Sequence, residues 1–384
     1  MKRLSKAQAF LAIVLAVLLF CPFGCRKEEP GGRQVKIGAI LPLTGDAAQW
    51  GIAPKRGAEL AVERINDSGG VNGRRLYLIV EDDRAVPADG VSAIRKLLST
   101  EKVSMIVGSV ASSVTLALAP IAEKNKVVLI SPASSSPKIT DSGDYIFRVM
   151  PSDDLRGQIF ADYLFHNRKI QHVDILYVNN EGGVGNKNSF CNYFQKYGGT
   201  VGLMEQYAQE SSDLRTQITK IKNSLSEAMI VVSYPKDTVL ILQQSRELGV
   251  QKPLYFQTEA VEDPQVLSKA GETAEGIEYI LPLQASGPAR VEFVNLYHQK
   301  YGVGPELFAA EAYDCIMLLA EAVRKQGAVS NISSSLVKEY LYDVRNYEGA
   351  SGRITFNDKG DVIKPMAIKK IVGGVPQIVE TLGG

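Results

Sequence analysis

Short apolar runs rich in valine and isoleucine alternate with amphipathic segments along most of this chain, and this alternation limits the folds that it can adopt. In the first part, strands are predicted at Val35–Leu41, 76–81, 103–107 and 127–130, and helices at 51–65, 89–99 and 113–124. The strands lack a polar face, as is typical of strands that helices cover on both sides. Repeated β-α units of this kind predict a doubly wound, mostly parallel sheet.

The same alternation restarts at residue 155 and predicts a second α/β lobe. Its strands are predicted at 173–178, 202–206, 229–233 and 253–257, and its helices at 156–166, 187–197, 214–224 and 238–248. Helices then follow at 289–301, 307–326 and around Ser334–Asp343, and the tail is predicted to be a β-hairpin that turns at Gly373 and Gly374. The expected fold class is α/β, with two lobes that each contain a doubly wound, mostly parallel sheet flanked by helices.

The beginning of the chain has the pattern of an export signal. A basic start precedes the apolar segment 9–24 (AFLAIVLAVLLFCPFG), which is shorter than the roughly 20 residues that span a membrane. Gly24 and Cys25 resemble the processing site of a bacterial lipoprotein, which implies that Cys25 carries the lipid. Pro22 departs from that pattern, which has an aliphatic residue there, and Cys21 is a poorer site because a bulky aromatic residue precedes it. A plain secretory signal or an uncleaved anchor therefore remains an alternative.

Under this interpretation residues 1–24 are a signal peptide and residues 25–34 a polar tether with proline and glycine. The folded part would work outside the cytoplasm, in the periplasm or an equivalent compartment, held to a membrane by its lipid. The chain has 43 Lys and Arg against 42 Asp and Glu. Three of the basic residues lie in the signal, so the remainder is nearly neutral and no nucleic-acid partner is expected.

The residues needed for catalysis or metal binding are not arranged in any known pattern. Cys191 and Cys315 lie far apart; an oxidising compartment permits a disulfide between them, and two buried free thiols are the favoured alternative. There is no CxxC motif or Cys/His cluster, so no metal or cofactor is expected. None of the three histidines pairs with an obvious nucleophile, and there is no GxSxG motif, which argues against a hydrolase.

Several stretches together resemble one protein family. They are 40–50 (ILPLTGDAAQW), 57–73 (GAELAVERINDSGGVNG), 81–93 (EDDRAVPADGVSA) and, most clearly, 106–140, with support from 305–322 and 352–360. In this order they resemble the type I periplasmic binding proteins of the leucine/isoleucine/valine-binding branch, which are the substrate receptors of ABC importers. The resemblance extends from about Val35 to the end of the chain.

The resemblance implies two lobes joined by three crossing segments, near Met150, Leu281 and Phe356. Lobe I would then comprise 35–149 plus 282–355, and lobe II 150–281 plus 356–384. It also implies a monomer that closes over a small ligand by hinge motion and reports closure to a membrane permease.

Ligands of doubly wound sheets bind outside the carboxyl ends of the strands, which selects a few loops. In the first lobe, Ser112 and Ser113 are predicted N-cap residues of the helix that follows strand 103–107. The start of that helix would offer free N–H groups to an anion. The resemblance implies that Ser112 binds a ligand carboxylate; the alternative is that both serines only cap the helix.

The next loop of the first lobe, 131–137 (SPASSSP), is rigid and rich in hydroxyl groups. By its spacing, the resemblance assigns the ligand-binding hydroxyl to Ser135, while Ala133 and Ser134 would offer backbone groups. A solvated turn is the alternative, because serine and proline favour turns without any function.

In the second lobe, Tyr234 and Glu259 each follow a predicted strand. A lone acid beside a ligand site suits an ammonium group, and the resemblance assigns the α-amino group of an amino acid to Glu259. The alternatives are an exposed loop acid for Glu259 and packing for Tyr234. Trp50, the only tryptophan, would line the side-chain pocket by the same resemblance or lie on the lobe surface, and Phe308 is a weaker candidate for that pocket.

One segment departs from the family pattern. Residues 181–185 (EGGVG) follow strand 173–178 and are expected to form a loop, at a place where relatives often have a tyrosine over the ligand. Its loss would enlarge the site. The sequence thus predicts a non-enzymatic, lipid-anchored receptor for a small zwitterion such as an amino acid; the alternative is a ligand-sensing module of the same fold.

Overall fold

The computed structural model describes residues 34–45, 47–209, 211–329 and 331–382. The expected signal peptide, the lipid-bearing Cys25 and all of the expected tether except Gln34 lie outside the described residues. Among the described residues, no helix is both long enough and apolar enough to cross a membrane.

The first lobe is built on a five-stranded, fully parallel sheet with the order β2-β1-β3-β4-β5. Its strands are β1 Val35–Leu41, β2 Leu76–Asp82, β3 Met105–Gly108, β4 Val128–Ser131 and β5 Ile146–Arg148. Strand order reverses between β1 and β3, so the carboxyl ends of these two strands flank the point at which a doubly wound sheet binds its ligand.

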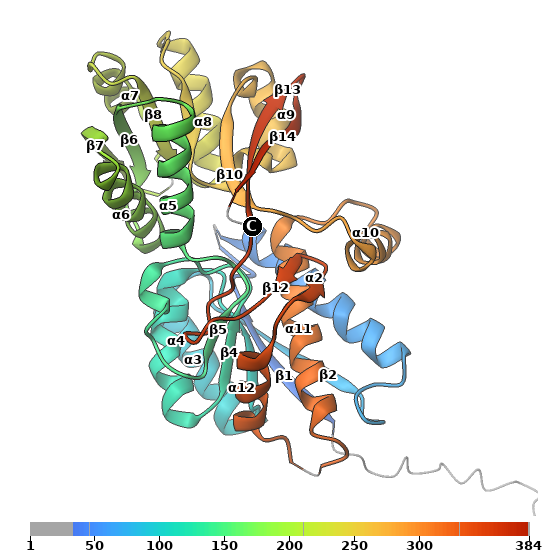
Figure 1. The fold of residues 1–384 in the computed structure, drawn as a ribbon. Coiled ribbons are helices and arrows are strands. Elements are labelled where there is room, and N and C mark those ends of the chain that lie inside the picture. Colours follow the sequence, from blue (N-terminus) through green and yellow to red (C-terminus); the bar gives the residue numbers. More distant parts are fainter. Residues whose placement is uncertain (1–33, 46, 210, 330, 383–384) are drawn as a thin grey trace, which may run out of the picture. The chain divides into compact units, whose positions relative to one another are not determined.

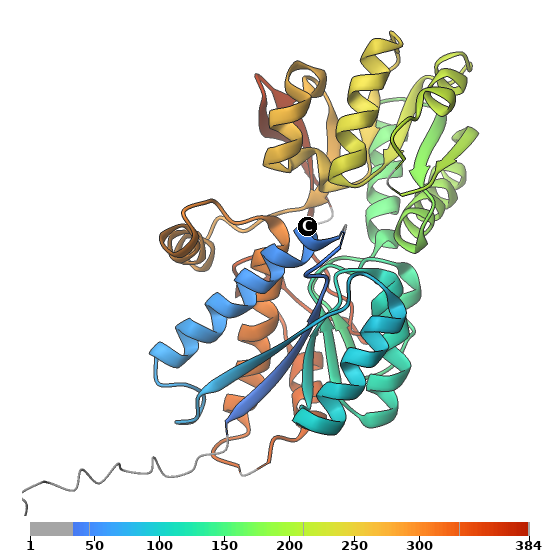
Figure 2. The same cartoon turned by 180° about the vertical axis from the view of Figure 1, so that it is seen from behind.

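Helices cover both faces of this sheet, as Figures 1 and 2 show. They are α2 Ala48–Asp67 and α11 Leu307–Lys325 with the shorter α12 Ser334–Asp343 on one face, and α3 Pro87–Lys96 and α4 Ser112–Asn125 on the other. Successive side chains of β3 follow this division: Met105 and Val107 pack in the core under α2 and α11, and Ile106 packs under α3 and α4. Successive side chains of a strand point to opposite faces, and helices cover both faces of this sheet. Every position of the strand is therefore buried, which explains the continuous runs of valine and isoleucine.

The second lobe contains a seven-stranded sheet with the order β14-β13-β10-β9-β8-β6-β7. Its strands are β6 His172–Val178, β7 Thr200–Tyr207, β8 Ala228–Val232, β9 Leu254–Phe256, β10 Glu278–Pro282, β13 Met366–Val372 and β14 Val375–Leu382. Five of them are parallel, and the tail adds β13 and β14 as the antiparallel hairpin predicted around Gly373 and Gly374. The expected fold class, two α/β lobes with mostly parallel sheets, is thereby confirmed.

The helices of the second lobe also divide between two faces. They are α5 Asp153–Asp162 and α6 Glu181–Lys196 on one face, and α7 Arg215–Lys222, α8 Pro235–Glu247 and α9 Pro264–Ala270 on the other. Cys191 of α6 and Cys315 of α11 are both buried and not bonded to each other. The alternative of two free thiols is therefore the correct one.

The chain passes between the two sheets three times. It leaves the first sheet after β5, returns between β10 and α10 Pro288–Tyr301, and crosses again between the short hairpin of β11 Tyr347–Gly349 and β12 Gly352–Ile354 and strand β13. A buried ion pair fixes the third crossing to the first lobe. Lys364 donates to Glu311 of α11 at 2.8 Å, and both side chains are fully buried.

Some elements differ from the sequence-based expectation. The segment 181–185, expected to be a loop, is the first turn of α6. The short strands β5, β11 and β12 and the short helix α9 were not predicted, because three- to seven-residue elements carry too little periodicity. Helices α5 and α3 each continue as one π-helical turn, at 163–167 and 97–101 respectively.

Candidate functional site

The carboxyl ends of β3 and β4 bring two serine-rich loops together. Ser131 at the end of β4 donates its hydroxyl to the carbonyl oxygen of Ser109 at 2.7 Å, and Ser134 donates to the same oxygen at 2.9 Å. Ser134 also shares a hydrogen bond of 2.8 Å with Thr115 of α4. The hydroxyl of Ser134 is thus used inside the lobe, where it fixes the position of the loop.

Backbone groups of this loop are engaged as well. The N–H groups of Ala133 and Ser134 donate to the hydroxyl of Ser131 at 3.3 and 2.9 Å. Both residues are buried. The loop is therefore rigid, as its composition predicts, and its shape is set by Ser131 rather than by solvent.

Ser112 and Ser113 are not the N-cap residues that the sequence predicts. Helix α4 begins at Ser112, and its N-cap is Ala111, whose side chain offers no acceptor. The helix starts one residue early because hydroxyl groups of the preceding turn serve the backbone: Ser109 accepts from the N–H of Ala111 at 3.3 Å. The hydroxyl of Ser112 instead accepts from the N–H of Ser136 at 3.2 Å, which joins the two loops.

Ser135 is held by the first residue of α5. Its hydroxyl donates to Asp153 Oδ2 at 3.0 Å, and its carbonyl accepts from the Asp153 N–H at 2.8 Å. Burial raises the pKa of Asp153 to about 6, although the nearby guanidinium of Arg156 and the hydrogen bond from Ser135 oppose this shift. Asp153 belongs to the second lobe, so this contact links a first-lobe serine to the start of second-lobe helix α5.

Glu259 is not the lone acid that the sequence predicts. It begins a short 3₁₀ turn after β9, and its Oε2 atom accepts from Arg156 Nη1 at 3.0 Å. The side chain of Arg156 is 2% exposed and that of Glu259 21%. Arg156 lies one turn after Asp153 on α5. Ser135 of the first lobe and Glu259 of the second are therefore both held by the first turn of the same helix.

Aromatic residues from the two lobes also meet. The rings of Trp50 on α2 and Tyr234, the N-cap residue of α8, lie with centroids 4.3 Å apart and planes tilted by 59°. Phe308 packs with Trp50 against the apolar residues at the ends of β1 and of the serine loops. The Tyr234 hydroxyl donates to Asn180 at 3.1 Å, and burial raises the pKa of Tyr234 to about 12.

The start of α6 faces the first lobe with a charged residue. Asn180 caps this helix by accepting from the N–H of Gly183 at 2.9 Å. Glu181 then accepts from Ser136 at 3.3 Å and from Lys138 at 3.1 Å. These side chains are polar contacts between the lobes.

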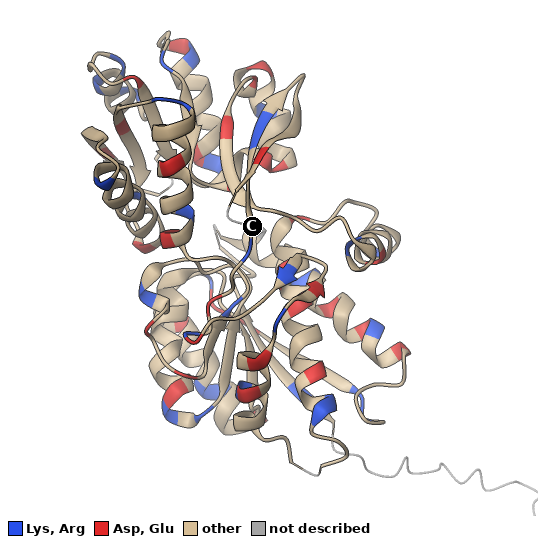
Figure 3. Cartoon of the chain, viewed as in Figure 1, with Lys and Arg blue, Asp and Glu red and all other residues tan. Residues whose placement is uncertain are grey.

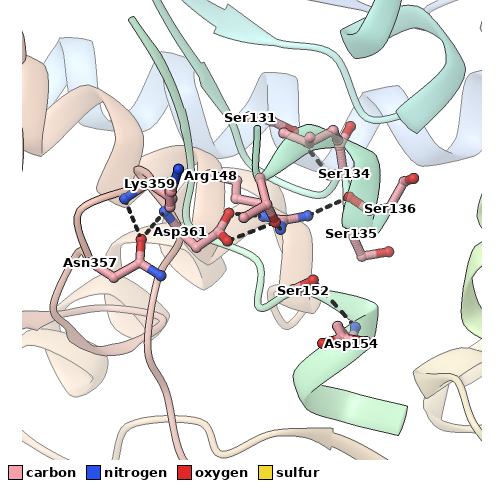
Figure 4. Close-up of polar contacts among 12 residues, drawn as sticks. Ser131, Ser134, Ser135, Ser136, Arg148, Ser152, Asp154, Asn357, Lys359 and Asp361 are labelled. Carbon is pink, nitrogen blue, oxygen red and sulfur yellow. Dashed lines mark hydrogen bonds and ion pairs between the residues drawn. The ribbon is translucent and has the colours of Figure 1, made fainter. Parts of the chain in front are cut away.

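The third crossing is tied to the serine loop by a buried guanidinium (Figure 4). Arg148 at the end of β5 donates to Asp361 at 2.6 Å, to the Ser136 carbonyl at 2.8 Å and to Thr140 at 2.7 Å. Asn357 shapes the turn before Asp361 by accepting from its N–H at 3.0 Å. A shift of this crossing would therefore be transmitted directly to the loop that carries Ser135.

The two consecutive acids at the end of β2, Asp82 and Asp83, have a structural role in the first lobe. Asp82 accepts from the N–H of Leu43 at 2.8 Å and from the N–H of Arg84 at 3.0 Å. Asp83 is buried and accepts from Ser109 at 2.6 Å. They fix the loops after β1 and β3. Basic and acidic residues are both spread over the two lobes (Figure 3), and some form ion pairs, as Lys55 and Glu59 do on α2.

Sequence reasoning placed Ser112, Ser135, Glu259, Tyr234 and Trp50 at strand or loop ends, but it missed the residues that hold them. Asp153, Arg156 and Asn186 come from α5 and α6, and of these three only Arg156 lies within the helices that the sequence predicts, 156–166 and 187–197. A carboxylate and an arginine within the first two turns of α5 were a usable signal, since charged residues there adjoin a lobe crossing.

Comparison with known proteins agrees with this fold. The family model described as periplasmic binding protein matches residues 34–375. A Leu/Ile/Val-binding protein homolog of Brucella melitensis is 27% identical over 333 residues, which cover 86% of this chain and 89% of that protein. The leucine-binding protein LivK of Thermotoga maritima is 29% identical, with a TM-score of 0.83 and coverage of 91% of this chain and 99% of the other.

A third relative has been solved with its ligand. The branched-chain amino acid substrate-binding protein LivJ of Streptococcus pneumoniae, in complex with isoleucine, is 27% identical with a TM-score of 0.80, and the likeness covers 91% of this chain and 99% of that one. The resemblance found in the sequence is confirmed. This chain belongs to the periplasmic binding protein family, in the branch of the leucine/isoleucine/valine-binding proteins of ABC transporters.

Proposed function

We propose that this chain is the extracytoplasmic receptor of an ABC importer and binds a small zwitterion, such as an amino acid, between its two lobes. The contact between Trp50 and Tyr234 carries the proposal, since it joins the aromatic residues of both lobes beside the ends of β1 and β8. Relatives whose names state leucine or branched-chain amino acid binding support it. Membership of a family of binding proteins supports a role in binding rather than catalysis.

In this proposal the first lobe binds the ligand carboxylate and the second binds its ammonium group. Ser112, Ser113 and the 133–135 loop lie at the start of α4 and the end of β4, where hydroxyl groups and the helix N-terminus favour an anion. Glu259 and Tyr234 would take the ammonium group, and Trp50 and Phe308 would contact the ligand side chain. Charge-assisted hydrogen bonds at a closed interface provide micromolar affinity, about −8 kcal/mol.

The lobe boundaries and the membrane attachment belong to the same proposal. Lobe I would comprise 35–149 plus 282–355 and lobe II 150–281 plus 356–384, so that closure occurs about the three crossings. A lipid on Cys25 would hold a monomeric receptor near its permease. Mass spectrometry of the protein from a membrane fraction tests this: an unmodified amino terminus other than Cys25 would contradict lipid attachment.

Calorimetric titration with the proteinogenic amino acids tests the binding function. We expect at least one to bind with micromolar or tighter affinity, and Glu259→Gln to weaken it at least tenfold while leaving the corresponding acid without an amine unaffected. Glu262→Gln is the matched control, because Glu262 lies in the same turn and pairs with Lys369 instead. Binding only of carboxylates that lack an amine would contradict the role of Glu259, and turnover of a substrate would contradict a pure receptor.

A further inference from the structure

Arg156 has hydrogen-bond donors that the protein does not use. Its Nη1 atom donates to Glu259 at 3.0 Å and to the backbone carbonyl of Gln257 at 3.2 Å. Its Nε and Nη2 atoms are buried and have no partner among the described residues. A buried charged donor without an acceptor is costly. The arginine therefore indicates that acceptor atoms from another molecule complete this place.

Two unpaired acceptors lie on Gln257, whose backbone carbonyl accepts from Arg156, and on Asn186, which is hydrogen-bonded to Gln257. Asn186 Oδ1 and Gln257 Oε1 are buried and lack partners among the described residues. Their orientation is fixed: Asn186 Nδ2 donates to Asp153 at 2.9 Å, and Gln257 Nε2 donates to the Asn186 carbonyl at 3.1 Å. Rotating either amide would set oxygen against oxygen, so both side-chain oxygens remain free.

Charge also restricts what this cluster accepts. The guanidinium of Arg156 is matched by Glu259 at 3.0 Å, and Asp153 adds a further carboxyl group on the same helix. A carboxylate group of the ligand would thus lie where the positive charge of Arg156 is already balanced. A neutral group that both accepts and donates hydrogen bonds fits better.

We infer that Arg156, Asn186 and Gln257 form a subsite for a neutral carboxamide or urea-like group of the ligand. The carbonyl oxygen of that group accepts from Arg156 Nε and Nη2, and its amino group donates to the two free amide oxygens. This inference rests on the proposed function and narrows it: the preferred guest has a polar amide end rather than an aliphatic side chain.

A single buried water has the same complement, since it accepts two hydrogen bonds and donates two. The proposal requires the ligand, rather than such a water, to occupy the place. The crystal structure of the complex separates them. A ligand carbonyl within hydrogen-bond distance of Arg156 supports the subsite, and a water there with the ligand elsewhere overturns it.

Titration with isosteric ligands is the direct test. Asparagine, leucine and aspartate have side chains of nearly equal shape, as do glutamine, methionine and glutamate. We expect the carboxamide of one series to bind at least tenfold more tightly than both its apolar and its acidic analogue. Tighter binding of leucine or methionine would overturn the subsite and leave the proposed receptor function intact.

Variants then assign the preference to these residues. Arg156→Met removes the donors while keeping an extended side chain, and we expect it to reduce the carboxamide-to-apolar affinity ratio to about one. Gln257→Leu removes one acceptor and serves as a second variant if the first fails to fold. Arg168→Met is the matched control: Arg168 pairs with Glu278 at 2.6 Å in the same lobe, and its loss should leave the ratio unchanged.

Ligands without an α-amine distinguish the two proposals. If succinamate binds and no amino acid does, the carboxamide subsite holds and the ammonium role of Glu259 fails. If amino acids bind without regard to their side-chain amide, the receptor function holds and the subsite fails. If none of these ligands binds, both proposals are overturned.

Discussion

Asp153 and Arg156 show what the sequence leaves out at the level of single residues. Strand-end reasoning located Ser135 and Glu259 correctly at the ends of β4 and β9. Their partners could not be predicted, because Arg156 and Glu259 are 103 residues apart. They meet only when helix α5 packs on the sheet that contains β9. Pairing between charged residues depends on the tertiary fold, which periodicity does not report.

The buried carboxyl group of Asp153 should make the stability of the protein depend on pH. Its pKa rises from 3.8 to about 6 because burial disfavours the charged form. The folded protein therefore holds the proton more tightly than the unfolded chain, so this contribution is complete below pH 3.8 and is lost as pH rises through about 6. At roughly 1.4 kcal/mol per pKa unit, the loss is about 3 kcal/mol.

Asp153→Asn removes this ionisation. The difference in free energy of unfolding between this variant and wild type should therefore shift in favour of the variant by about 2 to 3 kcal/mol as pH rises from 4 to 7, because only wild type loses the contribution of Asp153. Urea denaturation of both proteins across that range measures the difference. Parallel pH dependence of the two curves would contradict the buried, proton-retaining state of Asp153.

At the level of elements, strands were easier to predict than helix ends. The segments that form β1 and β8 have no polar face, so they can be recognised as strands whichever of their side chains point to either face of the sheet. The start of α6 was misassigned because three glycines within five residues reduce helix propensity. The structure explains Gly183: a β-carbon there would lie 2.0 Å from the Val178 carbonyl oxygen, so close packing of α6 on β6 excludes a side chain.

Substitutions in this turn should therefore have opposite effects. Gly183→Ala should reduce the free energy of unfolding by about 1 to 3 kcal/mol, because the backbone must shift. A β-carbon at Gly185 would meet only side-chain atoms, of Pro137 at 3.3 Å and of Ser136 at 3.8 Å. The gain in helix propensity in Gly185→Ala should therefore leave stability unchanged or up to about 1 kcal/mol higher. Thermal unfolding of both variants measures the contrast, and equal losses would contradict the packing argument.

For the molecule as a whole, the doubly wound lobes followed from the alternation of strands and helices, but the contacts between them did not. Trp50 and Tyr234 were each assigned to a site from their own lobe, and nothing in the sequence shows that their rings touch. Such contacts depend on how the crossings direct the lobes, and segments such as 355–365 have no repeating pattern.

Trp50 is the only tryptophan, so its fluorescence reports on the contact between the lobes. Tyr234→Ala should shift its emission to longer wavelength because the indole ring becomes hydrated, whereas Tyr234→Phe should preserve the wild-type spectrum. Addition of a bound amino acid should also change the wild-type emission. Identical spectra for all three proteins would show that the rings do not meet in solution.

Helix α11 also affects the order in which the chain can fold. It packs against α2, which ends 240 positions before α11 begins, and together they cover one face of the first sheet. The core of the first lobe therefore cannot be completed until most of the chain, including α11, has emerged from the ribosome or a translocation channel. Such late completion would keep the chain extended for longer, which agrees with the proposed extracytoplasmic location, because export requires passage through a membrane channel.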